Sequence, residues 1–195
     1  MNIKKLFYKF TNKEKYKKLK SDLLVAKKIK VLKSGFEQEI INISEKLKKK
    51  EISFLHSGHL GDVINALPVI KEISKISKCN LFLQTGKKLE EDAIGYKYKD
   101  DKIYMTHRMV NMVLPLLKKQ NYINSVEIFN DQKIDIDLNL FRKIPMNFNL
   151  DEVRWYFQLT GIHVDLSKQY LFVEEHKTIK NKIVIMRSIR RKNNF

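Results

Sequence analysis

The sequence predicts an α/β fold in which a mostly parallel sheet has helices on both faces. After Lys50, short runs rich in β-branched and aromatic residues alternate with longer runs of helical periodicity. Strands that alternate with helices are typical of βαβ units, which build parallel sheets covered by their crossover helices. Residues 1–50 precede this pattern and are rich in lysine, so we expect them to form a basic helical arm.

The predicted elements follow in a regular order. Apolar residues spaced by three and four positions from Val25 to Leu47 indicate one face of a long helix, which we expect to pack on its own domain. Strands are predicted at 52–56, 80–84, 125–129, 134–138, 170–173 and 182–186. Helices are predicted at 63–77, at 105–118 with Pro115 breaking it or starting its last piece, and from near Asn149 to Gly161, with Asp151 and Glu152 in the first turn.

The composition limits where the protein acts. No apolar run approaches the roughly 20 residues that span a bilayer, and the N-terminus lacks the apolar segment of a secretory signal. The single cysteine, Cys79, excludes an internal disulfide and is expected to be a small buried side chain rather than a nucleophile. We therefore expect a cytoplasmic protein, with peripheral association at the inner membrane face as an option.

The net charge of +17 is concentrated in the arm. Residues 1–50 carry 16 lysines against five acids, a net charge of +11 that leaves +6 for the other 145 residues. Such a segment favours a polyanion, and an anionic membrane is preferred to nucleic acid because arginine and interleaved exposed aromatics are scarce in the arm. A compositional origin stays open, since lysine outnumbers arginine 33 to 6, as in AT-rich genomes.

The stretch SFLHSGHLGDVINALPVIKEIS, residues 53–74, carries the most specific signal. It leads from a predicted strand through a glycine-containing turn into a predicted helix. That arrangement forms the corner of a Rossmann-like unit where free N–H groups and the helix dipole favour an anion or polar ligand. Two nucleotide-binding loops are disfavoured: His56 replaces the first glycine of G-x-G-x-x-G, and G-x-x-x-x-G-K-[ST] is absent.

Within this stretch, HLGDVINALPVIKEI resembles the N-terminal motif of the heptosyltransferase-like glycosyltransferases, which have the GT-B fold. The segments PLLKKQNYINSVEIF, DIDLNLFR and KIVIMRSIRRKNNF resemble parts of GT-B-like proteins more loosely. The resemblance implies that residues 51–181 form the Rossmann-like N-terminal domain, which faces a sugar acceptor. It also implies that Asp62 is the general base of an inverting, metal-independent transfer, with Gly58, His59 and Gly61 at the substrate.

The resemblance further implies a second domain. The family holds its nucleotide-sugar donor in a C-terminal Rossmann-like domain, for which 195 residues leave no room. Residues 182–195 resemble the start of that domain, where Arg187, Arg190 and Arg191 would bind donor phosphate if the rest were present. Three interpretations stay open: a split or truncated gene with a partner chain, a remnant without transferase activity, and a binding module that reuses the fold.

A different class of function competes with these. A non-catalytic basic protein would dock on an anionic membrane or nucleic acid through residues 1–50. Asp62 likewise has a competing role, because an aspartate at a helix start caps free N–H groups, commonly worth about 1 kcal/mol. Against that, transfer to a hydroxyl needs a carboxylate to take its proton, and neighbouring glycines let a ligand approach the backbone.

Two other groups of acidic and histidine residues match metal patterns. Asp135 and Asp137 form the D-x-D by which GT-A glycosyltransferases hold a metal, and strand alternation would put both carboxylates on one face. Short patterns of this kind arise often by chance. His56, His59 and Asp62 recur every third residue, which suits metal ligands on a helix rather than on a turn. We therefore expect no metal and no other cofactor.

Overall fold

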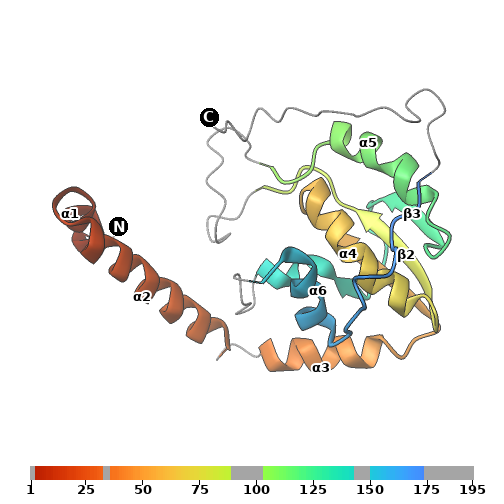
Figure 1. The fold of residues 1–195 in the computed structure, drawn as a ribbon, viewed down its shortest axis with the longest axis horizontal. Coiled ribbons are helices and arrows are strands. Elements are labelled where there is room, and N and C mark those ends of the chain that lie inside the picture. The colour runs from red at the N-terminus through yellow and green to blue at the C-terminus, as the bar shows by residue number, and fades with distance from the viewer. Residues whose placement is uncertain (1–2, 33–35, 89–102, 143–149, 174–195) are drawn as a thin grey trace.

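The computed structural model describes residues 3–32, 36–88, 103–142 and 150–173. Its centre is an all-parallel sheet with strand order β3-β2-β1-β4 (Figure 1). The strands are β1 Glu51–His56, β2 Lys78–Leu83, β3 Ser125–Ile128 and β4 Ile136–Asp137. The predicted α/β class is confirmed, and this order is that of the first four strands of a Rossmann sheet.

The strand order reverses beside β1. This strand pairs with β2 along its whole length, from Glu51 opposite Lys78 to His56 opposite Leu83. On its other edge it pairs with β4, where Phe54 lies opposite Ile136. Successive strands thus spread to one side of β1 until β4 is added on the other. Open α/β sheets bind their ligands at such a reversal, outside the carboxyl ends of the strands.

Three helices form a layer on one face of the sheet: α4 Leu60–Ile73, α5 His107–Lys118 and α6 Glu152–Thr160. Because α4 and α5 both connect strands in the same direction, right-handed crossovers place them on the same face, in front of the strands in Figure 1. Helix α6 packs beside α4. It begins at Glu152, later than the predicted start near Asn149, so Asp151, which was predicted in the first turn, caps the helix instead. The helix ends at Gly161 as predicted, whose φ of 72° is the left-handed conformation that glycine adopts freely.

The other helices also differ from the prediction. Helix α4 begins three residues earlier than expected, because Asp62 in its first turn accepts the N–H of His59, and it ends at Ile73. Helix α5 continues through Pro115, which was expected to interrupt it. Proline costs a helix one backbone hydrogen bond, and here that cost is tolerated on an exposed side of a helix whose Val110, Val113 and Leu117 are buried.

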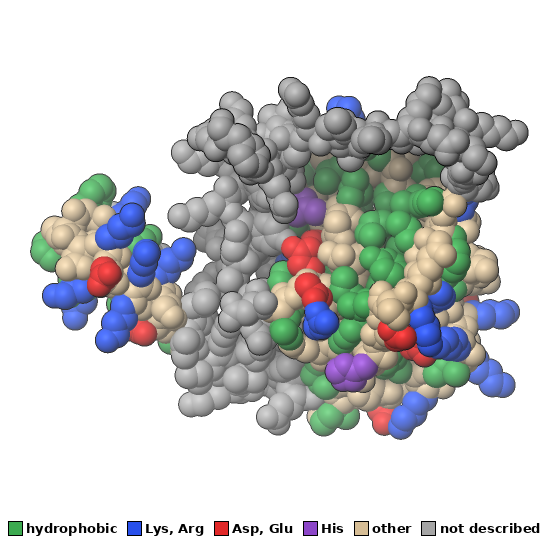
Figure 2. All heavy atoms as spheres, viewed as in Figure 1, with side chains coloured by type: hydrophobic (Ala, Val, Ile, Leu, Met, Phe, Trp, Pro, Cys, Tyr) green, Lys and Arg blue, Asp and Glu red, His purple; other side chains and the backbone are tan. Residues whose placement is uncertain are grey.

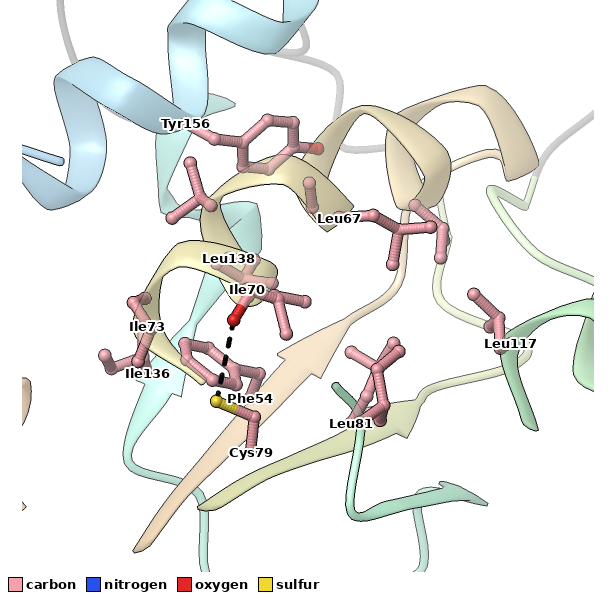
Figure 3. Packing of buried hydrophobic residues seen from close by; sticks show 14 of the residues in the cluster. Phe54, Leu67, Ile70, Ile73, Cys79, Leu81, Leu117, Ile136, Leu138 and Tyr156 are labelled. Atoms are coloured by element: carbon pink, nitrogen blue, oxygen red, sulfur yellow. Dashed lines mark hydrogen bonds between the residues drawn. The ribbon is translucent and has the colours of Figure 1, made fainter. Parts of the chain in front are cut away.

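The main hydrophobic core lies between the sheet and the helix layer (Figure 3). Phe54 and Leu81 from the strands meet Leu67 and Ile70 of α4 there. Side chains that alternate to the other face of the sheet, Leu55 and Phe82, are also buried.

Cys79 belongs to this core, as predicted. Its Sγ lies 3.7 Å from the carbonyl oxygen of Ile70, and its side chain is buried (Figure 3). Burial raises the pKa of the Cys79 thiol to about 12, so the reactive thiolate is scarce at neutral pH.

The lysine-rich segment contains α1 Ile3–Thr11, α2 Lys13–Leu32 and α3 Phe36–Lys46. Ile43 of α3 is buried in the main core, and Ile40 and Leu47 pack against it. The end of the predicted apolar face thus packs on its own domain. Among the described residues, no helix is both long enough and apolar enough to cross a membrane.

One predicted strand does not form, and another lies outside the described residues. Residues 170–173 are described but form no strand. Instead, the buried side-chain amide of Gln120 binds their backbone, accepting from the N–H of Phe172 (2.9 Å) and donating to its carbonyl (3.0 Å). These bonds take the place of a strand partner. The predicted strand at 182–186 and the proposed second-domain start at 182–195 lie outside the described residues.

Candidate active site

The loop after β1 and the segment after β4 meet at the point where the strand order reverses. Strand β1 ends at His56 and leads through Ser57, Gly58 and His59 into α4. Strand β4 leads directly into a 3₁₀ helix, η1 Leu138–Arg142. The backbone N–H of Ser57 donates to Oδ1 of Asn139 (2.9 Å), which joins the two segments. The glycine-containing loop therefore lies where Rossmann-like sheets bind ligands.

Asp62 forms a nearly buried ion pair with Arg142. The side chains are 5% and 10% exposed, and Nη2 of Arg142 contacts Oδ2 of Asp62. The same Oδ2 accepts the N–H of His59 (3.2 Å), while Nη1 of Arg142 donates to Asn139 (3.1 Å). Asp62 thus caps α4, as its position predicts, and also carries a charge that a second element neutralises.

Burial of Asp62 opposes the ionisation of its carboxyl group, whereas two neighbouring residues favour it. Burial raises the pKa of the Asp62 carboxyl above its ordinary value, although the guanidinium of Arg142 and the neighbouring His59 pull it down. Glu152 at the start of α6 behaves similarly: burial and the charge of Asp62 raise its pKa, while the side-chain amide of Asn65 donates to it (2.8 Å). A carboxylate with a raised pKa is a stronger base than one in water.

His56 is a neutral structural residue. Its Nδ1 accepts the N–H of Gly58 (2.9 Å), and its Nε2 lies 2.8 Å from the hydroxyl of Tyr156. That hydroxyl donates to the carbonyl of Asp62 (2.9 Å), so Nε2 must carry the imidazole proton. Burial, aided by the charge of Arg142, lowers the pKa of His56 well below its ordinary value. Both ring nitrogens are occupied, and His56 therefore has no lone pair left for a metal.

The two glycines of the loop have different surroundings. A Cβ on Gly58 would lie 2.6 Å from each of Nη2 of Arg142, Oδ2 of Asp62 and Cε1 of His56. Because Gly58 has no side chain, the Asp62–Arg142 ion pair can lie directly beside its backbone. Gly61 is exposed in the first turn of α4, and a Cβ there would have no neighbour within 4 Å. Of the predicted substrate contacts, Gly61 is exposed, whereas both ring nitrogens of His59 are buried.

The D-x-D carboxylates have separate structural partners. Asp135 pairs with Lys49 and accepts the N–H of Ser53 (3.0 Å), which fastens β4 to the start of β1. Asp137 accepts the N–H of Asn139 (2.9 Å) at the start of η1. Within the part of the chain that the structure describes, no group of three or more His, Cys, Asp or Glu side chains could hold a metal ion.

Asp135 should make stability depend on acidic pH. Partial burial raises its pKa, but the Lys49 ammonium and the Ser53 N–H outweigh that and lower it overall. A lowered folded-state pKa gives stability that is present above the unfolded-state pKa and is lost as pH falls through the folded-state value. Asp135→Asn should therefore cost about 1 kcal/mol in urea denaturation at pH 7 and progressively less as pH falls below about 4, the unfolded-state pKa.

The control for this prediction is Asp22→Asn on the exposed surface of α2, which should leave stability unchanged at both pH values. A loss from Asp135→Asn that stays constant between pH 7 and pH 3 would contradict the proposed charge pairing.

Several site residues were not predicted from the sequence: Arg142, Asn139, Tyr156 and Glu152. Arg142 and Asn139 do follow a predicted strand closely, and they lie within DIDLNLFR, one of the segments resembling GT-B-like proteins. Nothing local marks Tyr156, which reaches the site from α6. The predicted phosphate ligands Arg187, Arg190 and Arg191 lie outside the described residues.

No family model, curated protein or solved structure matches this chain. A function for the site can therefore be argued from its geometry and from the resemblance carried by residues 59–73.

Proposed function

We propose that this chain is the acceptor-side half of a GT-B-type glycosyltransferase in which Asp62 is the general base. One observation carries the proposal: the nearly buried Asp62–Arg142 pair lies near the carboxyl end of β1, where the strand order reverses, and Asp62 belongs to the segment that resembles the family motif. The described residues form one Rossmann-like sheet, and GT-B transfer takes place between two such units. The nucleotide-sugar donor would therefore be bound by a second unit.

The proposed chemistry assigns each group one task. Asp62 takes the proton of an acceptor hydroxyl as that oxygen attacks the anomeric carbon of the donor, and the bond from that carbon to the diphosphate breaks with its electron pair on the leaving oxygen. Among the described residues, Arg142 and the N–H of His59 both bind Oδ2, so Oδ1 is the oxygen assigned to receive the proton. Arg142 keeps the carboxylate ionised and oriented.

Asp62→Asn should lower turnover by about a hundredfold or more, because an amide does not accept a proton as a carboxylate does. The amide oxygen can still accept the N–H of His59, so the α4 cap is retained. The assay combines the full chain with a second Rossmann-like half from the same genome, labelled nucleotide sugars and a glycolipid extract from the source cells. The rise of turnover with pH that Asp62 produces in the parent should disappear in the variant.

The matched control is Asp151→Asn, which makes the same change at the exposed cap of α6 and should leave turnover unchanged. Circular dichroism must show that both variants are folded at the assay temperature, since Asp62 also pairs with Arg142. Unchanged turnover in the Asp62 variant would remove it from the mechanism. Tight nucleotide-sugar binding by the 195-residue chain alone would contradict the acceptor-side assignment.

A further inference from the structure

Helix α1 exposes two large aromatic side chains that no part of the proposed transferase site uses. Phe7 is 61% exposed and Phe10 is 79% exposed, the highest value among the large hydrophobic side chains described. Helical spacing places Phe7 and Phe10, three positions apart, on one face of the helix. The exposed Lys4 and Lys9 lie on either side of that face. The helix is therefore amphipathic, with an aromatic apolar face.

Basic side chains surround this face. Helix α2 packs on α1, and its first two turns carry exposed lysines at positions 13, 15, 17, 18 and 20 against one acid, Glu14. Lys15 extends to 6.0 Å from the ring centre of Tyr8, and Lys9 to 5.8 Å from that of Phe10. Figure 2 shows Lys side chains around α1 and α2 with hydrophobic side chains at the surface between them. Apolar and cationic groups thus share one surface.

We propose that α1 and the first two turns of α2 dock on an anionic phospholipid bilayer. Phe7 and Phe10 enter the boundary between headgroups and acyl chains, and the lysines contact lipid phosphates. A helix of nine residues is too short to span a bilayer but suits its interface. Residues 1–50 contain no arginine, the residue most used to bind nucleic-acid phosphates and bases, which favours a lipid surface over nucleic acid.

The structure also distinguishes α1 from the longer apolar face that the sequence marks between Val25 and Leu47. The end of that face is occupied, because Ile43 is buried in the main core. Membrane contact is therefore assigned to α1 and not to α3. The inference is independent of the proposed transferase activity.

The test is co-sedimentation of the full chain with vesicles of equal parts phosphatidylcholine and phosphatidylserine, and with vesicles of phosphatidylcholine alone. We expect binding to the anionic vesicles only, and weakening as salt screens the lysines. The double variant Phe7→Ser/Phe10→Ser should bind the anionic vesicles about tenfold more weakly or worse. The matched control is Ile76→Ser/Met112→Ser, which removes two other exposed hydrophobic side chains (76% and 65%) and should bind as the parent does.

Three outcomes would overturn the proposal. If the phenylalanine variant and the parent bound anionic vesicles equally, the binding would be nonspecific attraction between the lysines and the anionic lipids. Retention of DNA or RNA oligonucleotides by the parent, without vesicle binding, would assign the surface to nucleic acid. A change of oligomeric state in the phenylalanine variant, without an effect on vesicle binding, would assign the face to a second copy of the chain.

Discussion

Arg142→Met should destabilise the protein by about 3–5 kcal/mol, because it leaves a buried carboxylate without its counter-charge. Methionine preserves most of the side-chain stem of Arg142. The guanidinium carbon of Arg142 lies 4.3 Å from the ring centre of Phe141 and 4.6 Å from that of Tyr104. The lost interaction is then mainly the ion pair with Asp62, which is 5% exposed. Urea denaturation at pH 7 measures the change in the free energy of unfolding.

A second variant separates charge from packing. Asp62→Asn/Arg142→Met removes both charges, so it should recover much of the stability that the single Arg142→Met change loses. The single variant should also regain stability in acid. A carboxyl whose folded-state pKa is raised penalises folding above that pKa, and the penalty disappears as pH falls through it and the group takes up a proton. A cost below about 1 kcal/mol for Arg142→Met would show that solvent screens the pair.

The sequence predicts the elements whose signals are local. Strand β1 and helix α4 follow from a short apolar run, a glycine-containing turn and helical periodicity. Helix α6 follows from the acidic residues Asp151 and Glu152 near its start and from Gly161 at its end. The segment at 170–173 has the composition of a strand, yet it pairs with the side chain of Gln120 from 52 positions away. Composition indicates that a segment prefers an extended form, but tertiary contacts decide its partner.

The candidate site also combines one residue that a local sequence pattern predicts with others that only long-range contacts bring to it. Asp62 was predicted because its loop has a recognisable pattern, whereas its partner Arg142 lies 80 positions away. The contact exists because β4 pairs with β1, and strand order is a long-range property. Tyr156 depends in turn on where α6 packs against α4. The same long-range contacts explain the separate partners of Asp135 and Asp137, which spacing alone had placed in one metal-binding pattern.

Gly58→Ala should destabilise the protein by about 1–3 kcal/mol through overpacking, and by more if the ion pair separates. The new Cβ would lie 2.6 Å from atoms of Arg142, Asp62 and His56. None of the three can move freely, because the first two bind each other and both ring nitrogens of His56 are engaged. Denaturant unfolding gives the stability, and the transfer assay should lose activity with it.

Gly61→Ala is the matched control, three positions further along the chain. A Cβ at Gly61 meets nothing within 4 Å, and the residue lies in the first turn of α4, where alanine is a better helix former than glycine. This change should therefore be neutral or should stabilise the protein, by up to about 1 kcal/mol. Equal losses from both substitutions would mean that the loop tolerates no side chain anywhere. A loss of stability confined to Gly58→Ala would show that position 58 needs glycine because Asp62 and Arg142 approach its backbone closely.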